Sequence, residues 1–316
     1  MMPSAMAQSQ LFVRVPGSTS NLGPGFDMAG LALDLWLDVR ATPLPPAAGS
    51  SLGEVTGEAE SIDDPSPLFE AFACGAALAG VTDPPSLRFD LHSSIPLSRG
   101  LGSSGAAVAA GLLLGEAWAQ QQGYAAGDLT QVQLDEGTRL EGHPDNVVAS
   151  LLGGCTFSVP TQQGLRVIHT DLSPSLAFVV AWGASPLSTS KARAALPSQV
   201  PFSDAVENPR RLMLLLDGLR RGDGETLALA QHERLHVQHR LPLIPAGAEC
   251  LEAAATAGAF LATVSGAGSG LLAICGKEQS QSVAQAMEAC LNAADSPAHA
   301  RVLQPVFGRP KVQIQS

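Results

Sequence analysis

The chain has 316 residues, of which 45% are hydrophobic and 15% charged, and its formal net charge at neutral pH is −11. This length and composition allow two domains with buried cores. The acidic balance, with three lysines and no segment in which basic residues gather, argues against nucleic acid or an anionic membrane as a partner.

Targeting signals and cysteine chemistry are also constrained. No stretch has the length and apolar character of a membrane-spanning helix. The first ten residues, MMPSAMAQSQ, lack the basic and apolar regions of a secretory signal, and we expect a frayed tail there. The five cysteines are odd in number and form no CxxC pair. We therefore expect reduced thiols in a cytoplasmic protein, and no zinc site.

The first half of the chain mixes strand-like alternation with helical spacing. The predicted strands are 11–15, 31–40 and 87–92, and the predicted helices are 67–79, 103–120, 128–140 and 147–152. Residues 16–27 (PGSTSNLGPGFD) read as a loop, and residues 42–57 as a surface hairpin. The helix at 103–120 is apolar on nearly every side, which predicts that it is buried.

After the Gly153-Gly154 break, strands and helices continue to the C-terminus. The predicted strands are 155–159, 165–169, 176–181, 260–265, 271–275 and 301–305, and the predicted helices are 203–221, 224–236, 246–257 and 280–293. There is no internal repeat and no low-complexity linker. We predict an α+β fold in two domains, residues 1–160 and 161–316.

The segment PLSRGLGSSG, residues 96–105, has the features of an anion-binding turn. A strand ends, a glycine loop follows, and a helix begins at Ser103 and Ser104. Free amides at a helix start favour an anion, and a serine hydroxyl can reach a phosphate or Mg²⁺. The loop has no lysine, so it is not a Walker A motif. Tight packing at a helix start would need similar glycines, so both interpretations stay open on these features alone.

Three motifs in the chain resemble those of the GHMP kinase superfamily, and specifically of its homoserine kinases. The glycine loop resembles the phosphate loop P-x-x-x-G-L-G-S-S-[AG]. Residues 15–33, VPGSTSNLGPGFDMAGLAL, resemble the homoserine kinase pattern P-A-T-x-A-N-L-G-P-G-F-D-x-L-G-L-A-L. Residues 262–274, ATVSGAGSGLLAI, resemble the third GHMP motif. The three occur in the family's order and spacing.

Three further segments extend the resemblance over nearly the whole chain. They are EGHPDNV at 141–147, LSTSKARAALP at 187–197 and RLHVQHRLPLIP at 234–245. The resemblance implies an N-terminal domain like ribosomal protein S5 domain 2, with a left-handed β-α-β crossover, and a ferredoxin-like C-terminal domain. Family members are often homodimers.

The implied reaction is ATP-dependent phosphorylation of the side-chain hydroxyl of L-homoserine, in threonine biosynthesis. Such a transfer needs in-line positioning and charge neutralisation. Two alternatives stay open: a GHMP kinase for another small alcohol of the mevalonate type, and a catalytically inactive GHMP-fold binding protein. The resemblance pairs Asp27 with the ammonium group of the substrate. Mevalonate has no ammonium group, which argues against a mevalonate-type kinase.

The resemblance also implies residue roles. It assigns ATP binding to the glycine loop and the first residues of the helix after it. These residues are Pro96, Leu97, Ser98, Arg99, Gly100, Leu101, Gly102, Ser103, Ser104, Gly105 and Ala106. Glu141 would ligate Mg²⁺ together with Ser103 or Ser104. Without the resemblance, Glu141 reads as a surface carboxylate at a helix end.

For the substrate, the resemblance pairs Asp27 with the ammonium group, beside Asn21. Arg193 and Arg240 would hold the carboxylate, because a guanidinium fits a planar carboxylate with two hydrogen bonds. Thr189 would line the site. Taken alone, either arginine reads as a solvated surface charge.

The resemblance implies a catalytic set of Asn146, Asp145 and Arg193. We expect Asn146 to orient the reacting hydroxyl and Asp145 to support it, although in some GHMP kinases an aspartate nearby is the base. His143 reads as a hydrogen-bonded structural histidine. The chain departs from the family at Ser66 and Pro67, where an asparagine usually helps to hold adenine, and at Ser269, where proline is usual.

Overall fold

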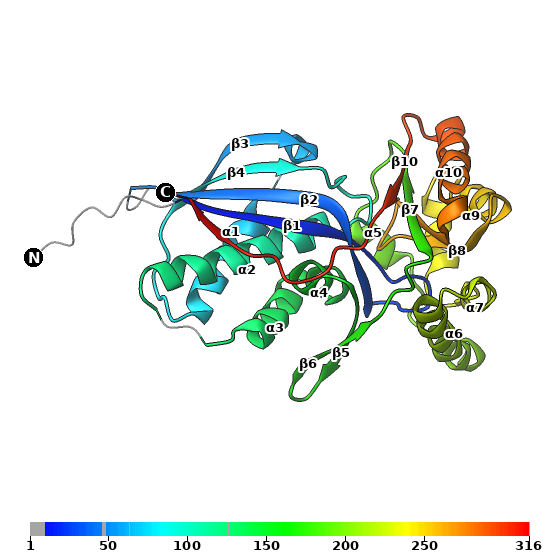
Figure 1. Cartoon of the computed structure of the whole chain (residues 1–316), viewed down its shortest axis with the longest axis horizontal. Helices are drawn as coiled ribbons and strands as arrows, with labels where there is room; N and C mark the ends of the chain where they lie inside the picture. The colour runs from blue at the N-terminus through cyan, green and yellow to red at the C-terminus, as the bar shows by residue number, and fades with distance from the viewer. Residues whose placement is uncertain (1–9, 46–48, 63, 125–126, 316) are drawn as a thin grey trace, which may run out of the picture.

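The computed structural model describes residues 10–45, 49–62, 64–124 and 127–315. Residues 1–9 of the predicted ten-residue tail lie outside it, whereas Gln10 belongs to the first strand. The chain builds two β-sheets, each covered by helices, and the C-terminal segment runs back along the first sheet (Figure 1). No helix in the described residues is long and apolar enough to cross a membrane. The predicted α+β class is confirmed.

The first sheet has seven strands in the described chain. They are β1 (Gln10–Ser20), β2 (Ala29–Pro43), β3 (Ser51–Gly57), β4 (Leu87–Ser93), β5 (Cys155–Thr161), β6 (Gly164–Thr170) and β11 (Gln313–Gln315). The order β11-β1-β2-β4-β3 forms the main path, and the β5–β6 hairpin joins it through β2. β3 and β4 are parallel, and α1 lies between them in the chain, which makes a β-α-β unit.

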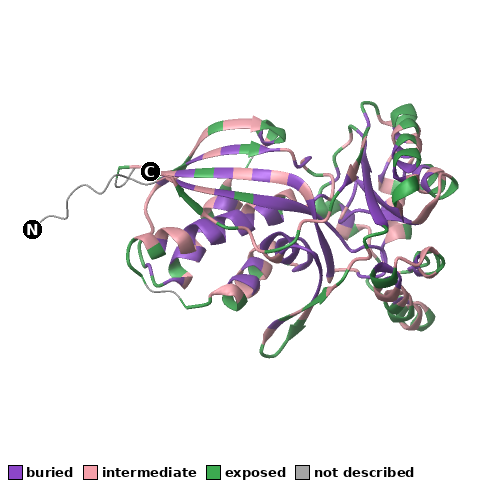
Figure 2. Cartoon of the chain, viewed as in Figure 1, coloured by how far each residue is buried: buried purple, intermediate pink, exposed green. Residues whose placement is uncertain are grey.

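Helices cover one face of this sheet (Figure 1). They are α1 (Ser66–Leu78), α2 (Ser103–Gln121), α3 (Thr130–Glu141) and α4 (Asp145–Leu152), and a 3-10 turn spans Glu58–Ser61. The predicted burial of α2 is confirmed, because Ala109, Leu112 and Leu114 have no exposed surface. The buried layer between helices and sheet is visible in Figure 2. This packing fixes the start of α2, where the glycine loop ends.

The second sheet is antiparallel, in the order β10-β7-β9-β8. Its strands are β7 (Leu176–Trp182), β8 (Ala259–Val264), β9 (Leu271–Gly276) and β10 (His299–Leu303). The helices of this half are α5 (Thr189–Ala194), α6 (Phe202–Arg221), α7 (Gly224–Ala230), α8 (Val237–Arg240), α9 (Gly247–Thr256) and α10 (Ser280–Ala294), with 3-10 turns at Leu241–Leu243 and Lys277–Gln279. Four antiparallel strands beside α9 and α10 agree with the expected ferredoxin-like arrangement. The division at residue 160 stays a prediction.

Two predicted elements in the first half are wrong. Residues 16–20 were expected to be loop, but β1 continues to Ser20 because, after a bulge at Pro16/Gly17, it pairs with residues 30–33 of β2. The hairpin expected at 42–57 does not form, because β3 pairs in parallel with β4 instead of turning back on β2. In both cases the segment becomes a strand by pairing with another strand, and local turn composition does not reveal that pairing.

One predicted helix in the second half is too long. The helix expected at 224–236 ends at Ala230, and α8 begins after it. The Glu233 carboxylate accepts hydrogen bonds from the amides of Leu235, His236 and Val237. Because this side chain satisfies the free amides of a new helix start, the chain turns there and brings Arg240 toward β1.

Candidate active site

One cavity of about 350 Å³ gathers most of the predicted site residues from both halves of the chain. The predicted residues that line it are Asn21, Asp27, Pro96, Leu97, Ser98, Gly100, Leu101, Gly102, Ser103, Ser104, Gly105, Glu141, Asp145, Asn146, Thr189, Arg193 and Arg240. Arg99 and Ala106 do not line it. Arg99 donates to the carbonyl oxygens of Leu97 and Gly183, which fastens the loop to the segment after β7, and Ala106 is in the core.

Two glycines let the phosphate loop approach its neighbours closely. Gly102 has φ +72°, and a Cβ there would lie 2.3 Å from Ser18 Oγ. Gly100 has φ +65°, and a Cβ there would lie 1.9 Å from the Ser265 carbonyl oxygen. A side chain at either position would meet both a strained backbone and a steric clash. The loop is therefore held between β1 and the third GHMP motif.

The start of α2 lines the cavity and has the features of an anion-binding site. Ala106 N donates to the Gly102 carbonyl oxygen at 2.9 Å, so the helical hydrogen bonds begin there. The amides of Ser103, Ser104 and Gly105 precede this bond and have no acceptor within the helix. The first turn contains no acidic side chain. Free amides and the helix dipole therefore favour a phosphate at this place.

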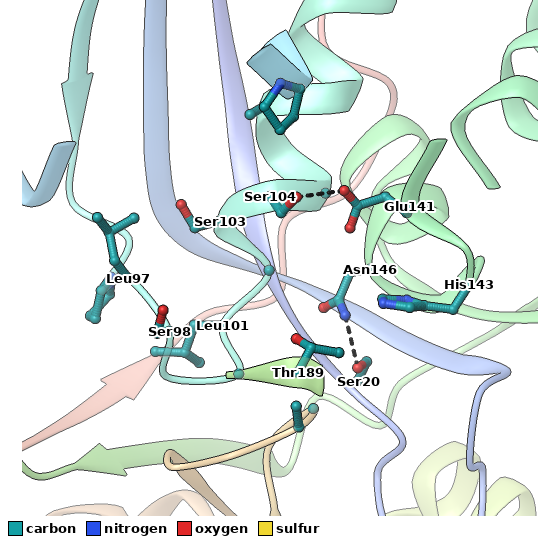
Figure 3. Close-up of a pocket in the computed structure, with 18 of the residues that line it drawn as sticks. Ser20, Leu97, Ser98, Leu101, Ser103, Ser104, Glu141, His143, Asn146 and Thr189 are labelled. Carbon is teal, nitrogen blue, oxygen red and sulfur yellow. Dashed lines mark hydrogen bonds between the residues drawn. The ribbon is translucent and has the colours of Figure 1, made fainter. Parts of the chain in front are cut away.

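Glu141, the last residue of α3, reaches the start of α2. Its Oε1 accepts a hydrogen bond from Ser104 Oγ at 2.6 Å (Figure 3). Burial raises the pKa of Glu141, although the Ser104 hydrogen bond and His143 act in the opposite direction. Ser103 points away from Glu141 in Figure 3. Of the two predicted serines, Ser104 is thus the one beside the carboxylate.

The Glu141–Ser104 pair fits Mg²⁺ chemically, since carboxylate and hydroxyl oxygens are its preferred ligands. The described residues contain no group of three or more His, Cys, Asp or Glu side chains that could hold a metal. A protein that supplies only one carboxylate and one hydroxyl suits a Mg²⁺ ion that takes its other ligands from water and nucleotide phosphates.

Asp145 begins α4 and is buried. Its Oδ1 accepts hydrogen bonds from the Asn146 amide at 2.9 Å and from His143 Nδ1 at 2.7 Å. Burial lowers the pKa of His143, but the hydrogen bond and charge of Asp145 outweigh it, and the net shift is upward. Both donors act on Oδ1 of Asp145, and its contacts with His143 and the Asn146 amide are consistent with the predicted supporting role.

The Asn146 side chain is held by two hydroxyls from β1. Its Oδ1 accepts a hydrogen bond from Ser18 Oγ at 3.0 Å. Its Nδ2 donates to Ser20 Oγ at 3.0 Å (Figure 3). Ser18 and Ser20 share one face of the strand because side chains alternate. The sequence analysis missed both serines, because it ended the strand at residue 15. Extending the alternation to residue 20 would have revealed the pair.

Asp27 and Arg193 form an ion pair with each other. Arg193 Nη2 and Nη1 donate to Asp27 Oδ1 and Oδ2 at 2.8 and 3.0 Å. Both side chains are 38% exposed. The hydrogen bond to Asp27 raises the pKa of Arg193. The two groups predicted to hold the substrate's opposite charges therefore lie in direct contact.

Arg240 is buried, and no carboxylate in the described part of the chain forms an ion pair with it. Arg240 as a whole is 2% exposed. Its Nη1 donates a hydrogen bond to the Gly266 carbonyl oxygen at 2.8 Å, and its Nε has no hydrogen-bond acceptor among the described residues. The guanidinium lies 5.1 Å from the centre of the Phe26 ring. Burial lowers its pKa, and Asp27 opposes that shift only in part. Because a buried charge without a counter-ion is costly, this position favours an anionic ligand.

Asn21 and His236 support this end of the cavity. Asn21 Nδ2 donates to the Gly266 carbonyl oxygen at 2.8 Å, and its Oδ1 accepts the Asp27 amide at 2.9 Å. His236 Nε2 donates to the Gly23 carbonyl oxygen at 2.9 Å, and its ring stacks on Phe26 at 5.0 Å. Burial lowers the pKa of His236. The sequence analysis missed His236, whose role depends on a contact across more than 200 residues.

The opposite end of the cavity is largely apolar. Its lining includes Ile62, Pro65, Pro67, Leu68 and Leu91. An apolar slot suits a flat nucleotide base. Pro67 occupies this wall where the family pattern has an asparagine near the helix start.

Known proteins are similar to this chain in sequence and in fold. Residues 68–154 match the GHMP kinases N terminal domain model, and residues 215–293 match the GHMP kinases C terminal model. The chain is 39% identical to the homoserine kinase of Prochlorococcus marinus (strain MIT 9303) over 88% of this chain and 87% of that protein. It is also 39% identical to the homoserine kinase of Microchaete diplosiphon, over 89% of this chain and 90% of that protein.

A solved structure agrees with the sequence relatives. The crystal structure of homoserine kinase from Cytophaga hutchinsonii superposes with a TM-score of 0.82 at 25% identity, covering 99% of this chain and 100% of that one. Fold, motif order and sequence identity over most of the chain agree, and the chain therefore belongs to the homoserine kinase family of the GHMP kinases.

Proposed function

We propose that this protein transfers the γ-phosphoryl group of ATP to the side-chain hydroxyl of L-homoserine, forming O-phospho-L-homoserine for threonine biosynthesis. The observation that supports this most strongly is the composition of the cavity. An anion-binding helix start with Glu141 lies at one end, and Asp27, Arg193 and the unpaired Arg240 lie at the other. A phosphate donor and a zwitterionic acceptor fit these two ends.

At the nucleotide end, the free amides of Ser103, Ser104 and Gly105 hold phosphate oxygens. Glu141 and Ser104 would hold Mg²⁺, which would neutralise phosphate charge. The carboxylate must be ionised for this role, so the raised pKa of Glu141 makes ligation weaker at acidic pH. The apolar wall at Ile62, Pro65 and Leu68 receives the base.

At the acceptor end, Arg240 takes the carboxylate of homoserine, because its buried guanidinium forms no ion pair with a carboxylate of the described residues and its Nε has no acceptor there. Asp27 takes the ammonium group, and Arg193 is released to share the carboxylate. Thr189 lines this region. With both charged ends held, the side-chain hydroxyl is directed toward Asn146 and the phosphate loop. Positioning of this kind accounts for much of the rate of phosphoryl transfer.

A coupled assay of ADP release, with Mg-ATP and a panel of L-homoserine, mevalonate and galactose, tests the proposal. We expect turnover with homoserine alone, and a new phosphomonoester signal by ³¹P NMR. Turnover with mevalonate or galactose instead would support a different GHMP kinase. Absence of turnover with all three would support a binding protein. The homodimer remains a prediction of the family resemblance, and light scattering on the purified protein tests it. The cytoplasmic location remains a prediction of the cysteine pattern.

A further inference from the structure

Ser20, the last residue of β1, lies at the point where the two ends of the cavity meet. Its residue is 1% exposed and lines the cavity. Its carbonyl oxygen accepts the Gly266 amide at 3.1 Å, which ties it to the loop that also receives Arg240. Ser18, two residues earlier, lies against Gly102 of the phosphate loop. Ser20 is thus placed between the acceptor end and the phosphates.

The hydroxyl of Ser20 has an unused hydrogen-bond donor. Its Oγ accepts Asn146 Nδ2 at 3.0 Å, and in the described chain its own proton has no acceptor. A serine hydroxyl carries one donor in addition to its acceptor positions. Since the side chain faces the cavity and is otherwise buried, that donor is available to a ligand.

Asn146 has little donor capacity left. One of its two Nδ2 hydrogens goes to Ser20 at 3.0 Å, and the other has Asp145 Oδ1 at 3.5 Å as its neighbour. Its Oδ1 already accepts from Ser18. The role of orienting the acceptor hydroxyl therefore cannot rest on Asn146 alone. Ser18, Asn146 and Ser20 form a chain whose free end is the Ser20 hydroxyl.

We propose that the Ser20 hydroxyl donates a hydrogen bond to the reacting hydroxyl oxygen of the acceptor alcohol and holds that oxygen in line with the γ-phosphoryl group. This inference rests on the proposed function and adds a substrate contact to it. The pattern that residues 15–33 resemble has alanine at this place, so we expect Ser20→Ala to fold.

The test compares two ligands and two serine variants. L-2-Aminobutyrate has the zwitterion of homoserine but no hydroxyl. With a non-hydrolysable ATP analogue present, calorimetry should show that Ser20→Ala weakens homoserine binding roughly 2- to 12-fold, the range for one neutral hydrogen bond, and leaves 2-aminobutyrate unchanged. Ser18→Ala is the matched control, because Ser18 also bonds to Asn146 but does not line the cavity. It should weaken homoserine binding less than Ser20→Ala does, because it reaches the hydroxyl only through Asn146.

A second arm separates direct contact from action through Asn146. In an Asn146→Ala background, Ser20→Ala should still lower kcat/KM for homoserine, with an unchanged KM for ATP. If the effect disappears in that background, or if Ser20→Ala weakens both ligands equally or neither, the proposal is wrong. If the wild type turns over homoserine and Ser20→Ala does so equally well, only the Ser20 contact is rejected. If the wild type is inactive on homoserine, the proposed function is rejected as well.

Discussion

Arg193 and Asp27 hold each other through two hydrogen bonds of 2.8 and 3.0 Å, although 166 residues separate them in sequence. Each has the kind of partner that an amino-acid zwitterion offers. The substrate ammonium can replace Arg193 on Asp27, and the substrate carboxylate can replace Asp27 on Arg193. Because both side chains are partly exposed, this exchange requires little loss of hydration. The site thus presents one positive and one negative side chain in direct contact.

Removal of the Asp27 charge should slow the reaction only with substrates that carry an ammonium group. We expect Asp27→Asn to lower kcat/KM for homoserine roughly 10- to 150-fold, since a hydrogen bond to a charged group contributes about 1.5–3 kcal/mol. 4-Hydroxybutyrate, which lacks the amine, should lose little further in the variant. Steady-state kinetics with both substrates provide the comparison. Equal losses for both would mean that Asp27 serves the fold through Arg193.

Glu141→Gln should reduce turnover by orders of magnitude without destabilising the ligand-free protein. Its folded-state pKa is raised above the ordinary value of 4.5, so the folded protein holds that proton more tightly than the unfolded chain does. The ionised carboxylate therefore reduces stability at pH 7, and this penalty fades as the pH falls toward 4.5. Melting temperatures from pH 5 to 8 should show the variant equal to or above wild type, with the largest gap at high pH. Near wild-type turnover at saturating Mg²⁺ and ATP would exclude Glu141 as a ligand.

Asn146→Ala should damage turnover more than Asp145→Asn. Asn146 links Ser18 and Ser20 beside the acceptor, whereas Asp145 supports His143 and the Asn146 amide. An isosteric amide at 145 retains part of that support. Rate profiles against pH for the two variants decide the order. Loss of one limb of the profile in Asp145→Asn, with the larger fall in rate, would identify Asp145 as a general base.

Gly102→Ala should impair both ATP use and stability. The backbone has φ +72°, and the new Cβ would lie 2.3 Å from Ser18 Oγ. We expect a loss of about 1–3 kcal/mol in the free energy of unfolding and a higher KM for ATP. Gly123→Ala is the control, since Gly123 has φ +85° but open space around its Cβ position. It shares the backbone strain and should leave the KM for ATP unchanged. If both variants raise that KM alike, the clash at Ser18 is irrelevant.

Short-range sequence signals predicted much of the fold. The apolar run of α2 and the glycine loop before it were identified, because burial and helix starts leave local patterns. The end of β1 was missed, since residues 16–20 have turn composition and become strand only by pairing with β2. The parallel β3–β4 pair was missed for the same reason.

The candidate site shows the same limit. Motif resemblance identified Glu141, Asp27 and Arg240, and the structure brings them to one cavity. Contacts that cross the molecule were not predictable from spacing, notably Asn146 with Ser20. Likewise, nothing in the sequence separates Ser103 from Ser104 as the partner of Glu141. That distinction depends on which hydroxyl faces α3.

The central claim is that this cavity recognises the carboxylate of an amino-acid alcohol beside the ATP phosphates, and Arg240 tests it most directly. The measurement is kcat/KM for two enzymes, wild type and Arg240→Ala, with two acceptors, homoserine and 3-aminopropan-1-ol, which lacks the carboxylate. The account predicts a roughly 10- to 150-fold loss for homoserine, little further loss for the poorer acceptor, and an unchanged KM for ATP. Equal losses for both acceptors would contradict the account, because Arg240 would then serve the fold or the phosphates.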